Sequence, residues 1–438
     1  MDTLNIKNAV AAAAAAWGVQ DYEIAIDTEE SAGAEALKEE ISTVSYSRSS
    51  TMRVRCVVAG RSGYASSELV TAEEAAALVE QAYLNAQAVD DEDTLELFAG
   101  SECYARDTRP MPELPDAEWL KNQALTLQKL ANSADEKIVD GTQCFASGLR
   151  VGNYLINSRG LDVGYECALV YQGVDAAVKD GEEAADAARV ASSAAETPEQ
   201  SVSRAVSAAL SKLGASSVPS GKYDIILAKE ALRNLLATYA EVFSARSAYL
   251  KTTRLAGMEG KTVAAACVSL LDDPFHPGLF SHRPYDGEGV AVKTKAVIEN
   301  GELKTLLYNR MYAHLMEKET TGNAAGAKTI APLGLYFAPG TCSEEELLQK
   351  LGDGLYITAL NGLHAGTNTQ SGDFSLQAEG FRVENGKKTA PIKEFTVADN
   401  FFNLLRKVDG LADSVEFGVG SSFGAPDTLV RRVAVSGK

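Results

Sequence analysis

The chain has few imidazoles with which to hold a catalytic metal. The four histidines are the first candidates: His276, His282, His314 and His364. A catalytic zinc site takes three protein ligands from His, Cys, Asp or Glu and leaves one position for water. None of these histidines has a second histidine at helical spacing, and Pro277 and Gly278 exclude a regular helix between the first two. The spacing therefore predicts no metal site in this chain.

The glycine-rich segment 361–386 contains the second candidate site. Glycine permits backbone angles and close approaches that other residues exclude, so such a segment is typical of backbone shaped around another group. We expect residues 362–375 to line an enclosed peptide space or a subunit contact. The alternative is an inter-strand loop whose polar groups face bulk water. The candidate residues are His364, Ser371, Gly372, Asp373, Phe374 and Ser375.

Two patterns could supply a serine nucleophile. Either serine of the segment 362–375, with His364 and Asp373, provides the residue types of a catalytic triad, which only geometry can identify. Residues 420–424, Gly-Ser-Ser-Phe-Gly, fit the nucleophile-elbow pattern, but that elbow needs a helix after it. A proline and then a strand-like run follow, so we interpret residues 420–424 as a tight glycine loop.

A further polar motif, Arg-Pro-Tyr-Asp-Gly-Glu-Gly, occupies residues 283–289. It is either a wall of a peptide groove or a subunit contact, or it is a structural turn with its carboxylates in water; the residues leave both readings open. Its candidate residues are Arg283, Asp286 and Glu288. Thr321-Gly-Asn323 is a smaller motif that we interpret as structural.

The linker 216–221, Ser-Ser-Val-Pro-Ser-Gly, divides the chain into expected domains 1–215 and 222–438. In the second domain, Asn300-Gly301 and Asn385-Gly386 each lie between strand-like runs. This predicts two β-hairpins, because both residue types accept positive φ. The expected helices of this domain are 229–244, 308–317, 343–351 and 396–408. The predicted fold class is α+β, with a mixed α/β N-terminal domain and a mainly antiparallel β C-terminal domain with a few helices.

The first domain mixes helices and strands. Apolar stripes and capping residues predict helices at 3–17, from 71 to 86, from about 116 and from 197 to 214. Alternating apolar residues predict strands at 22–26 and 52–58, and residues 151–156 with 161–172 form an expected hairpin. The acidic run 90–93 and the loop 109–112 are expected to be solvated connections.

Composition excludes several functional classes. The net charge of −19 opposes binding to nucleic acid or an anionic membrane, since both would repel the chain. No apolar run approaches the roughly 20 residues needed to span a bilayer. The six cysteines form no CxxC pair, so we expect reduced, mostly buried thiols and a cytoplasmic protein.

Residues 222–435 resemble the C-terminal part of the TldD/PmbA family, once described as modulators of DNA gyrase and understood as a two-subunit zinc peptidase. The glycine-rich segment and the motif at 283–289 carry the resemblance. The catalytic member of that pair has His-Glu-x-x-x-His on a helix and a later cysteine. Here residues 236–241 read Leu-Ala-Thr-Tyr-Ala-Glu, and residues 416–424 contain no cysteine. The resemblance therefore points to the PmbA (TldE) branch.

This resemblance implies a non-catalytic, TldE/PmbA-like subunit of a TldD/TldE-type zinc metallopeptidase complex that degrades or trims peptides. It implies a TldD-like catalytic partner in a heterodimer or higher assembly, or a homodimer when the chain is alone. It places zinc in the partner and no cofactor in this chain. Two alternatives stay open: a stand-alone hydrolase that uses unrecognised residues, and a pure scaffold or homodimer protein. Whether this chain is an enzyme by itself is therefore undecided by its sequence.

Overall fold

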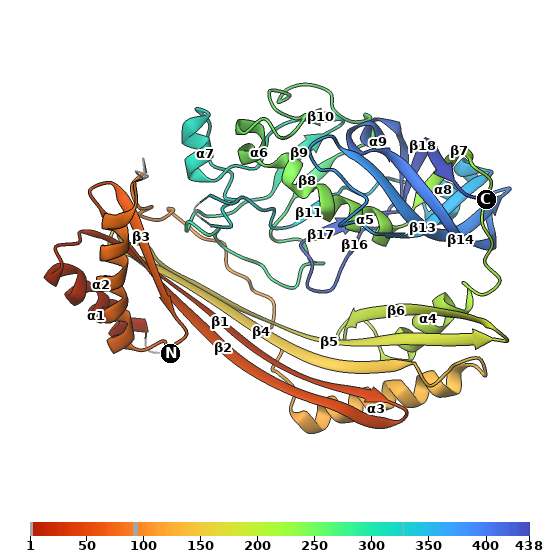
Figure 1. Ribbon diagram of the computed structural model, residues 1–438, viewed down its shortest axis with the longest axis horizontal. Helices are drawn as coiled ribbons and strands as arrows, with labels where there is room; N and C mark the ends of the chain where they lie inside the picture. The colour runs from red at the N-terminus through yellow and green to blue at the C-terminus, as the bar shows by residue number, and fades with distance from the viewer. Residues whose placement is uncertain (1–2, 91–94, 327) are drawn as a thin grey trace.

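The computed structural model describes residues 3–90, 95–326 and 328–438. The N-terminal half is built around an antiparallel sheet in the order β3-β2-β1-β4-β5-β6 (Figure 1). Its strands are β1 (Asp21–Leu37), β2 (Glu40–Val58), β3 (Arg61–Ser67), β4 (Gln143–Asn157), β5 (Asp162–Asp180) and β6 (Glu183–Ser192). The inner strands are long, and the two outer strands are short. Each outer strand therefore covers only part of its neighbour: β3 pairs with Met52–Val58, and β6 pairs with Tyr171–Asp180.

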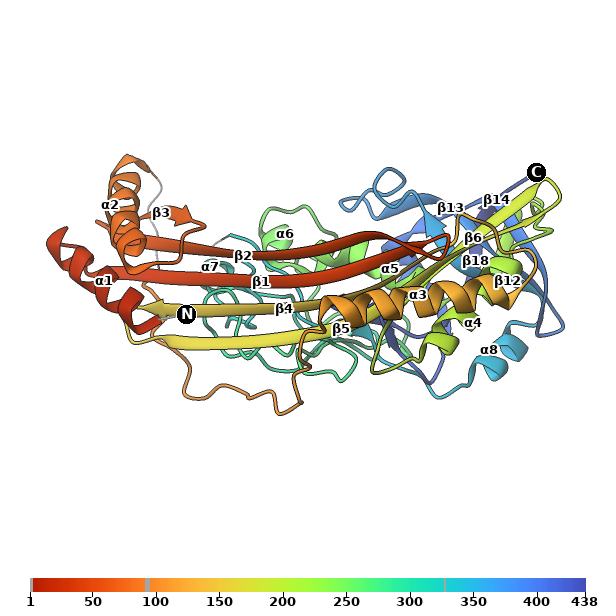
Figure 2. The same ribbon diagram turned by 90° about the horizontal axis from the view of Figure 1, so that it is seen from below.

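Helices cover one face of this sheet. α1 (Thr3–Ala16) and α2 (Ala72–Ala88) pack at one end, and α3 (Ala117–Ala134) and α4 (Pro198–Leu210) pack toward the other (Figure 2). Even-numbered residues of β1, such as Ile24 and Ala36, lie in the buried clusters under these helices. Since side chains alternate along a strand, the odd-numbered residues occupy the opposite face. That second face is turned toward the C-terminal half (Figure 1).

The C-terminal half contains a closed five-stranded barrel, because β14 pairs with both β13 and β18. The barrel strands are β7 (Gly221–Leu227), β12 (Gly354–Asn361), β13 (Asp373–Glu384), β14 (Lys387–Asn400) and β18 (Thr428–Ser436), and β15 (Val408–Leu411) pairs with β18. A second sheet follows the order β10-β9-β8-β11-β17-β16. Its strands are β8 (Leu270–Asp272), β9 (Lys295–Glu299), β10 (Glu302–Leu303), β11 (Leu335–Phe337), β16 (Glu416–Phe417) and β17 (Phe423–Ala425).

Short helices join these two sheets into one core. They are α5 (Lys229–Tyr239), α6 (Ala245–Tyr249), α7 (Arg310–Leu315), α8 (Glu344–Leu351) and α9 (Phe401–Lys407), with a 3-10 turn at Ala240–Phe243. One large apolar cluster includes Ile225 of the barrel, Leu235 of α5 and Val297 of the second sheet. Within the described ranges, none of the helices is long and apolar enough to cross a membrane.

The α+β prediction is confirmed, and so are both Asn-Gly hairpins. Asn300 and Asn385 have φ of 50°, and the following glycines have φ of 82° and 72°. Other expectations are wrong in detail. Residues 396–400 belong to β14 because they pair with β13, and residues 396–398 also pair with β18, so the helix there begins only at Phe401. Three of the six thiols are buried, those of Cys56, Cys144 and Cys167, rather than most of them. The acidic run 90–93 lies mostly outside the described residues.

Candidate functional site

α5 stands where the resemblance would place a zinc-binding helix, and its side chains are apolar there. Leu236 and Tyr239 are fully buried in the large C-terminal core, and Ala240 is nearly so. The Tyr239 ring stacks on Phe401 with centroids 4.5 Å apart, and its hydroxyl donates a hydrogen bond to the Asp373 carbonyl at 2.9 Å. This face of the helix therefore packs against protein and presents no imidazole or carboxylate to a metal ion.

The loop between β16 and β17 also lacks a metal donor of the expected kind. Residues 416–424 contain no cysteine, and they form a turn between two short antiparallel strands. No helix follows Gly424, so the nucleophile-elbow pattern is a glycine loop, as the sequence predicted. Across the described residues, no three His, Cys, Asp or Glu side chains gather closely enough to hold a metal ion. The residues of α5 and of this loop therefore do not provide the donor set of a zinc site.

The histidines are likewise engaged elsewhere. The ring of His276 lies 4.5 Å from that of Phe417 and 4.8 Å from that of Tyr336, between centroids. Burial lowers the pKa of His276 below its ordinary value of 6.5. His282 lies 3.5 Å from the Asp107 carboxylate, and His364 is exposed on the glycine-rich segment. The His282 ring lies 3.1 Å from the His276 carbonyl, so these two histidines are neighbours, but His276 packs on aromatic rings and His282 faces a carboxylate.

The segment 362–375 folds against the end of the barrel. Gly372 is buried with φ of 83°, and a Cβ there would lie 2.5 Å from the Phe402 ring, so only glycine fits. Phe374 is buried in the core, while Asp373 and Ser375 are exposed. The Asp373 carboxylate accepts a hydrogen bond from Asn400 at 2.8 Å, which lowers the pKa of Asp373.

The geometry of this segment does not support a serine catalytic triad. The Ser371 hydroxyl accepts a hydrogen bond from the Asp373 backbone amide at 3.2 Å. Among the described residues, no hydrogen bond links His364 to Ser371, Ser375 or Asp373, so no triad is assembled here. The segment also contributes no lining residue to the three cavities between the N-terminal sheet and the C-terminal loops.

The motif at 283–289 combines a structural turn with a cavity wall. The Asp286 carboxylate, 3% exposed, accepts hydrogen bonds from the backbone amides of Glu288, Val290 and Ala324. Burial raises the pKa of Asp286 above its ordinary value. Burial also raises the pKa of Glu288 to about 7, against a hydrogen bond from the Arg310 amide that lowers it. Arg283 and Asp286 line one cavity, and Glu288 lines the next.

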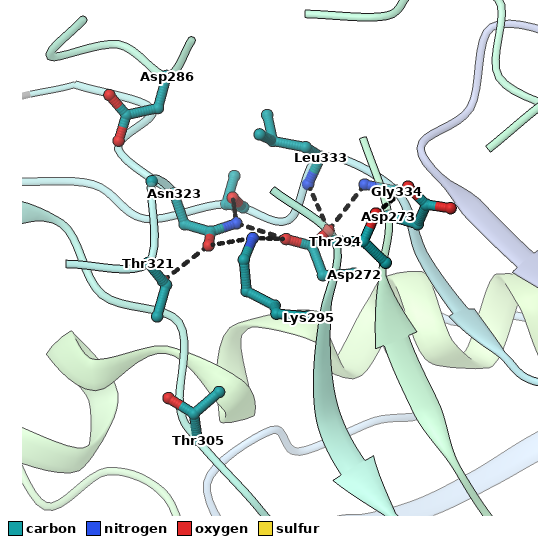
Figure 3. A network of polar contacts seen from close by, with 12 residues as sticks. Asp272, Asp273, Asp286, Thr294, Lys295, Thr305, Thr321, Asn323, Leu333 and Gly334 are labelled. Carbon is teal, nitrogen blue, oxygen red and sulfur yellow. Dashed lines mark hydrogen bonds and ion pairs between the residues drawn. The ribbon is translucent and has the colours of Figure 1, made fainter. Parts of the chain in front are cut away.

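A polar network supports this wall from behind (Figure 3). Lys295 lies 2.9 Å from the Asp272 carboxylate, and the Lys295 ammonium also donates to Asn323 at 3.1 Å. Asn323 in turn donates to Asp272 at 2.7 Å, and Thr321 donates to Asn323 at 2.7 Å. The Asp272 carboxylate also accepts hydrogen bonds from the backbone amides of residues 333 and 334. The Thr321-Gly-Asn323 motif thus joins two loops to the second sheet.

Three cavities follow one another along the contact between the N-terminal sheet and the C-terminal loops. Odd-numbered residues of the sheet, Glu23, Asp27, Glu29, Arg53 and Arg55, line two of them, of about 540 and 290 Å³. These two share Arg53 and Asn153, and the larger one meets the third cavity at Phe280. The alternation at 52–58 predicted a strand with one apolar and one polar face. It contained no signal that Arg53 and Arg55, on the polar face, line a cleft.

The third cavity, of about 750 Å³, has mostly apolar walls and two arginine bridges. We call it the β5 cavity, because residues 166–170 of β5 form one side of it. Arg109 donates to the carbonyls of Leu279 and Phe280, at 2.6 and 3.2 Å. Arg189 of β6 pairs with Glu196 and reaches Glu416 of β16 at 3.0 Å. The loop 109–112 is exposed, as expected of a solvated connection, and it also lines this cavity because Arg109 holds it against the C-terminal half.

The architecture is that of a metallopeptidase family. The model of the "PmbA/TldA metallopeptidase C-terminal domain" matches residues 220–437, and that of "PmbA/TldA metallopeptidase domain 1" matches residues 22–86. The chain belongs to the PmbA/TldD metallopeptidase family and is a PmbA/TldE-like member of it. This confirms the resemblance seen in the glycine-rich segment and the motif at 283–289.

Curated relatives match over a part of their length. A metalloprotease of Methanothermobacter thermautotrophicus is 31% identical over 215 residues, covering 48% of this chain and 46% of the relative. Metalloprotease PmbA of Escherichia coli O157:H7 is 29% identical over 223 residues, covering 50% and 48%. The alignments thus span about half the length of these relatives.

Solved structures match over nearly the whole chain. A Thermotoga maritima protein, described as a proposed modulator of a DNA gyrase, has a TM-score of 0.89 and 27% identity, and covers 98% of this chain and 99% of its own. TldE from Thermococcus kodakarensis has a TM-score of 0.89 at 22% identity, covering 99% and 100%. At that lower identity the match shows the fold alone.

Proposed function

We propose that this chain is the non-catalytic subunit of a two-subunit zinc metallopeptidase that degrades or trims peptides. One observation carries the proposal: α5 and the loop 416–424, where the catalytic member has its motif, contain no imidazole pair and no cysteine. A zinc-bearing partner would polarise the scissile carbonyl and activate the attacking water. This chain would close the chamber and shape the path of the peptide.

The cleft supports this role for the chain. Backbone edges and polar side chains of both halves line a continuous series of cavities, which suits an extended peptide better than a compact small molecule. Arg283, Asp286 and Glu288 lie in this cleft and are proposed as groove residues. For the segment 362–375, which lies outside the described cavities, we propose the partner contact. The expected domains 1–215 and 222–438 would then be the two walls of the cleft.

Reconstitution tests the proposal. The chain should be mixed with a HExxxH-bearing relative from the same genome, and hydrolysis of unfolded casein should be followed for each protein and for the mixture. We expect a discrete complex, hydrolysis that needs the relative's metal, and no hydrolysis by this chain alone. Metal-dependent hydrolysis by this chain alone would establish the stand-alone hydrolase instead. No complex and no added activity would favour the scaffold or homodimer alternative.

A further inference from the structure

The β5 cavity lies against an unpaired strand edge. β6 pairs with β5 only from Tyr171 to Asp180, although β5 begins at Asp162. One further hydrogen bond, from the Ser193 amide to the Val170 carbonyl at 2.9 Å, ends the pairing. In the described chain, no backbone hydrogen bond from another segment reaches this side of β5 between residues 163 and 169. The edge is therefore free along one wall of the cavity.

The register shows which backbone groups point off this edge. In an antiparallel pair, alternate residues of a strand direct both N–H and C=O to one neighbour. The Ser193–Val170 bond assigns the even residues of β5 to the β6 side, and neither pairing of β5 contains a bulge. Gly164, Glu166 and Ala168 therefore direct their amide and carbonyl groups away from β4 and off the sheet. Their spacing matches the hydrogen-bonding repeat of an added antiparallel strand.

The walls of the cavity define what could lie there. Apolar side chains such as Leu169, Val190 and Phe417 line it, so alternate side chains of an added strand would be buried. The charged lining residues are four carboxylates and two guanidiniums: Asp107, Glu166, Glu196, Glu416, Arg109 and Arg189. This excess of negative charge, in a chain of net charge −19, complements a basic peptide and repels an acidic one.

We propose that the free edge of β5, from Gly164 to Val170, binds an extended peptide with alternating basic and apolar residues as an added strand, its apolar side chains in the β5 cavity. This inference rests on the proposed function, since it names the class of peptide that the cleft would receive. It assigns that peptide to the N-terminal sheet of this chain, whether or not a catalytic partner is bound.

A proline substitution tests the edge directly. Ala168→Pro removes an amide that points off the sheet and leaves the pairing with β4 intact. Ala188→Pro is the matched control, because even residues of β6 face the outer edge of the sheet and Ala188 is exposed outside the cavity. The probe is a fluorescein-labelled ten-residue peptide of alternating Lys and Val, read by fluorescence anisotropy. We expect Ala168→Pro to weaken binding about tenfold and Ala188→Pro to change it less than about twofold.

Hydrogen exchange on the unmodified chain gives a second measurement that needs no variant. The peptide should protect the amides of Gly164, Glu166 and Ala168, while those of the odd residues, already bonded to β4, stay unchanged. Equal binding by folded Ala168→Pro, absent protection, or equal binding of a Glu-Val peptide would overturn the proposal. So would protection of these amides by the catalytic relative without peptide, which would assign the edge to the partner subunit.

These outcomes are separable from those of the reconstitution. If the complex hydrolyses casein but the edge binds no peptide, the edge proposal alone fails. If the edge binds the peptide but the mixture hydrolyses nothing, the proposed function fails and the peptide site stands.

Discussion

At the scale of single residues, Glu288 shows how the cleft alters ionisation. Burial raises its pKa from the ordinary 4.5 to about 7. The folded protein therefore holds a proton that the unfolded chain releases between these two pH values, and stability falls as pH rises through that window. Glu288→Gln removes this penalty and keeps an oxygen that can accept the hydrogen bond from the Arg310 amide.

Glu288→Gln should therefore gain stability relative to the unmodified chain as pH rises. We expect melting temperatures that coincide near pH 4.5, diverge in favour of the variant up to about pH 7, and stay parallel above it. Differential scanning calorimetry at a series of pH values measures this. Glu80→Gln, on the exposed side of α2, is the control and should show no such divergence. A constant difference at all pH values would contradict the raised pKa.

Lys295 contributes to the stability of the fold by pairing with a buried carboxylate. Its side chain is 8% exposed beside the Asp272 carboxylate, which is inaccessible to solvent. Lys295→Met would leave Asp272 buried without its cation, and breaking such a pair costs about 3 to 5 kcal/mol. Urea denaturation should show this loss. Lys304→Met removes an exposed lysine paired with Glu302 and should leave the unfolding midpoint nearly unchanged. Equal effects of the two variants would show that burial does not set the cost.

At the scale of elements, local signals explain what the sequence could predict. Thr197 and Gln200 form a capping box, and the helix begins at Pro198 as expected. Asn385-Gly386 forms its hairpin because both residues adopt positive φ. These features depend on a few neighbouring residues. The same is true of the glycine-rich segment, whose Gly372 has no space for a side chain.

Elements set by distant pairing escaped prediction. The expected strand at 22–26 extends to Leu37 because β1 pairs with β2 along its whole length and with β4 from Glu23 onward. The alanine-rich residues 183–192 form β6 through pairing with β5, although alanine favours helices. The cleft is lined by residues far apart in the sequence, such as Glu23, Glu288 and Glu416. A single sequence contains no signal that these residues lie along one cleft. The missing metal motif could be recognised only by comparison with the pattern of the family.

At the scale of the whole molecule, the two halves meet through polar bridges around the cavities and through one small apolar cluster, in which Tyr285 packs with Leu155 and Leu161. Tyr285 donates to the Asn153 carbonyl at 3.0 Å, and Arg310 donates to the Glu96 carbonyl at 3.0 Å. Arg189 adds its contact with Glu416. Contacts of this kind, arranged around water-accessible space, hold two bodies together less tightly than a continuous apolar core does. Removing one bridge should therefore open the cleft before it unfolds either half.

Cys167 reports on that opening, since it lines the β5 cavity and is 6% exposed. Arg189→Met should raise the rate at which iodoacetamide alkylates Cys167, measured by mass spectrometry. Cys144, buried in the N-terminal core, should stay protected, which separates opening from unfolding. Arg204→Met is the matched control, because Arg204 also pairs with Glu196 but lies in the same half. If both variants expose Cys167 equally, the effect belongs to Glu196 and not to the bridge between the halves. If Arg189→Met exposes Cys167 and Cys144 together, the bridge stabilises the N-terminal fold rather than the closed cleft.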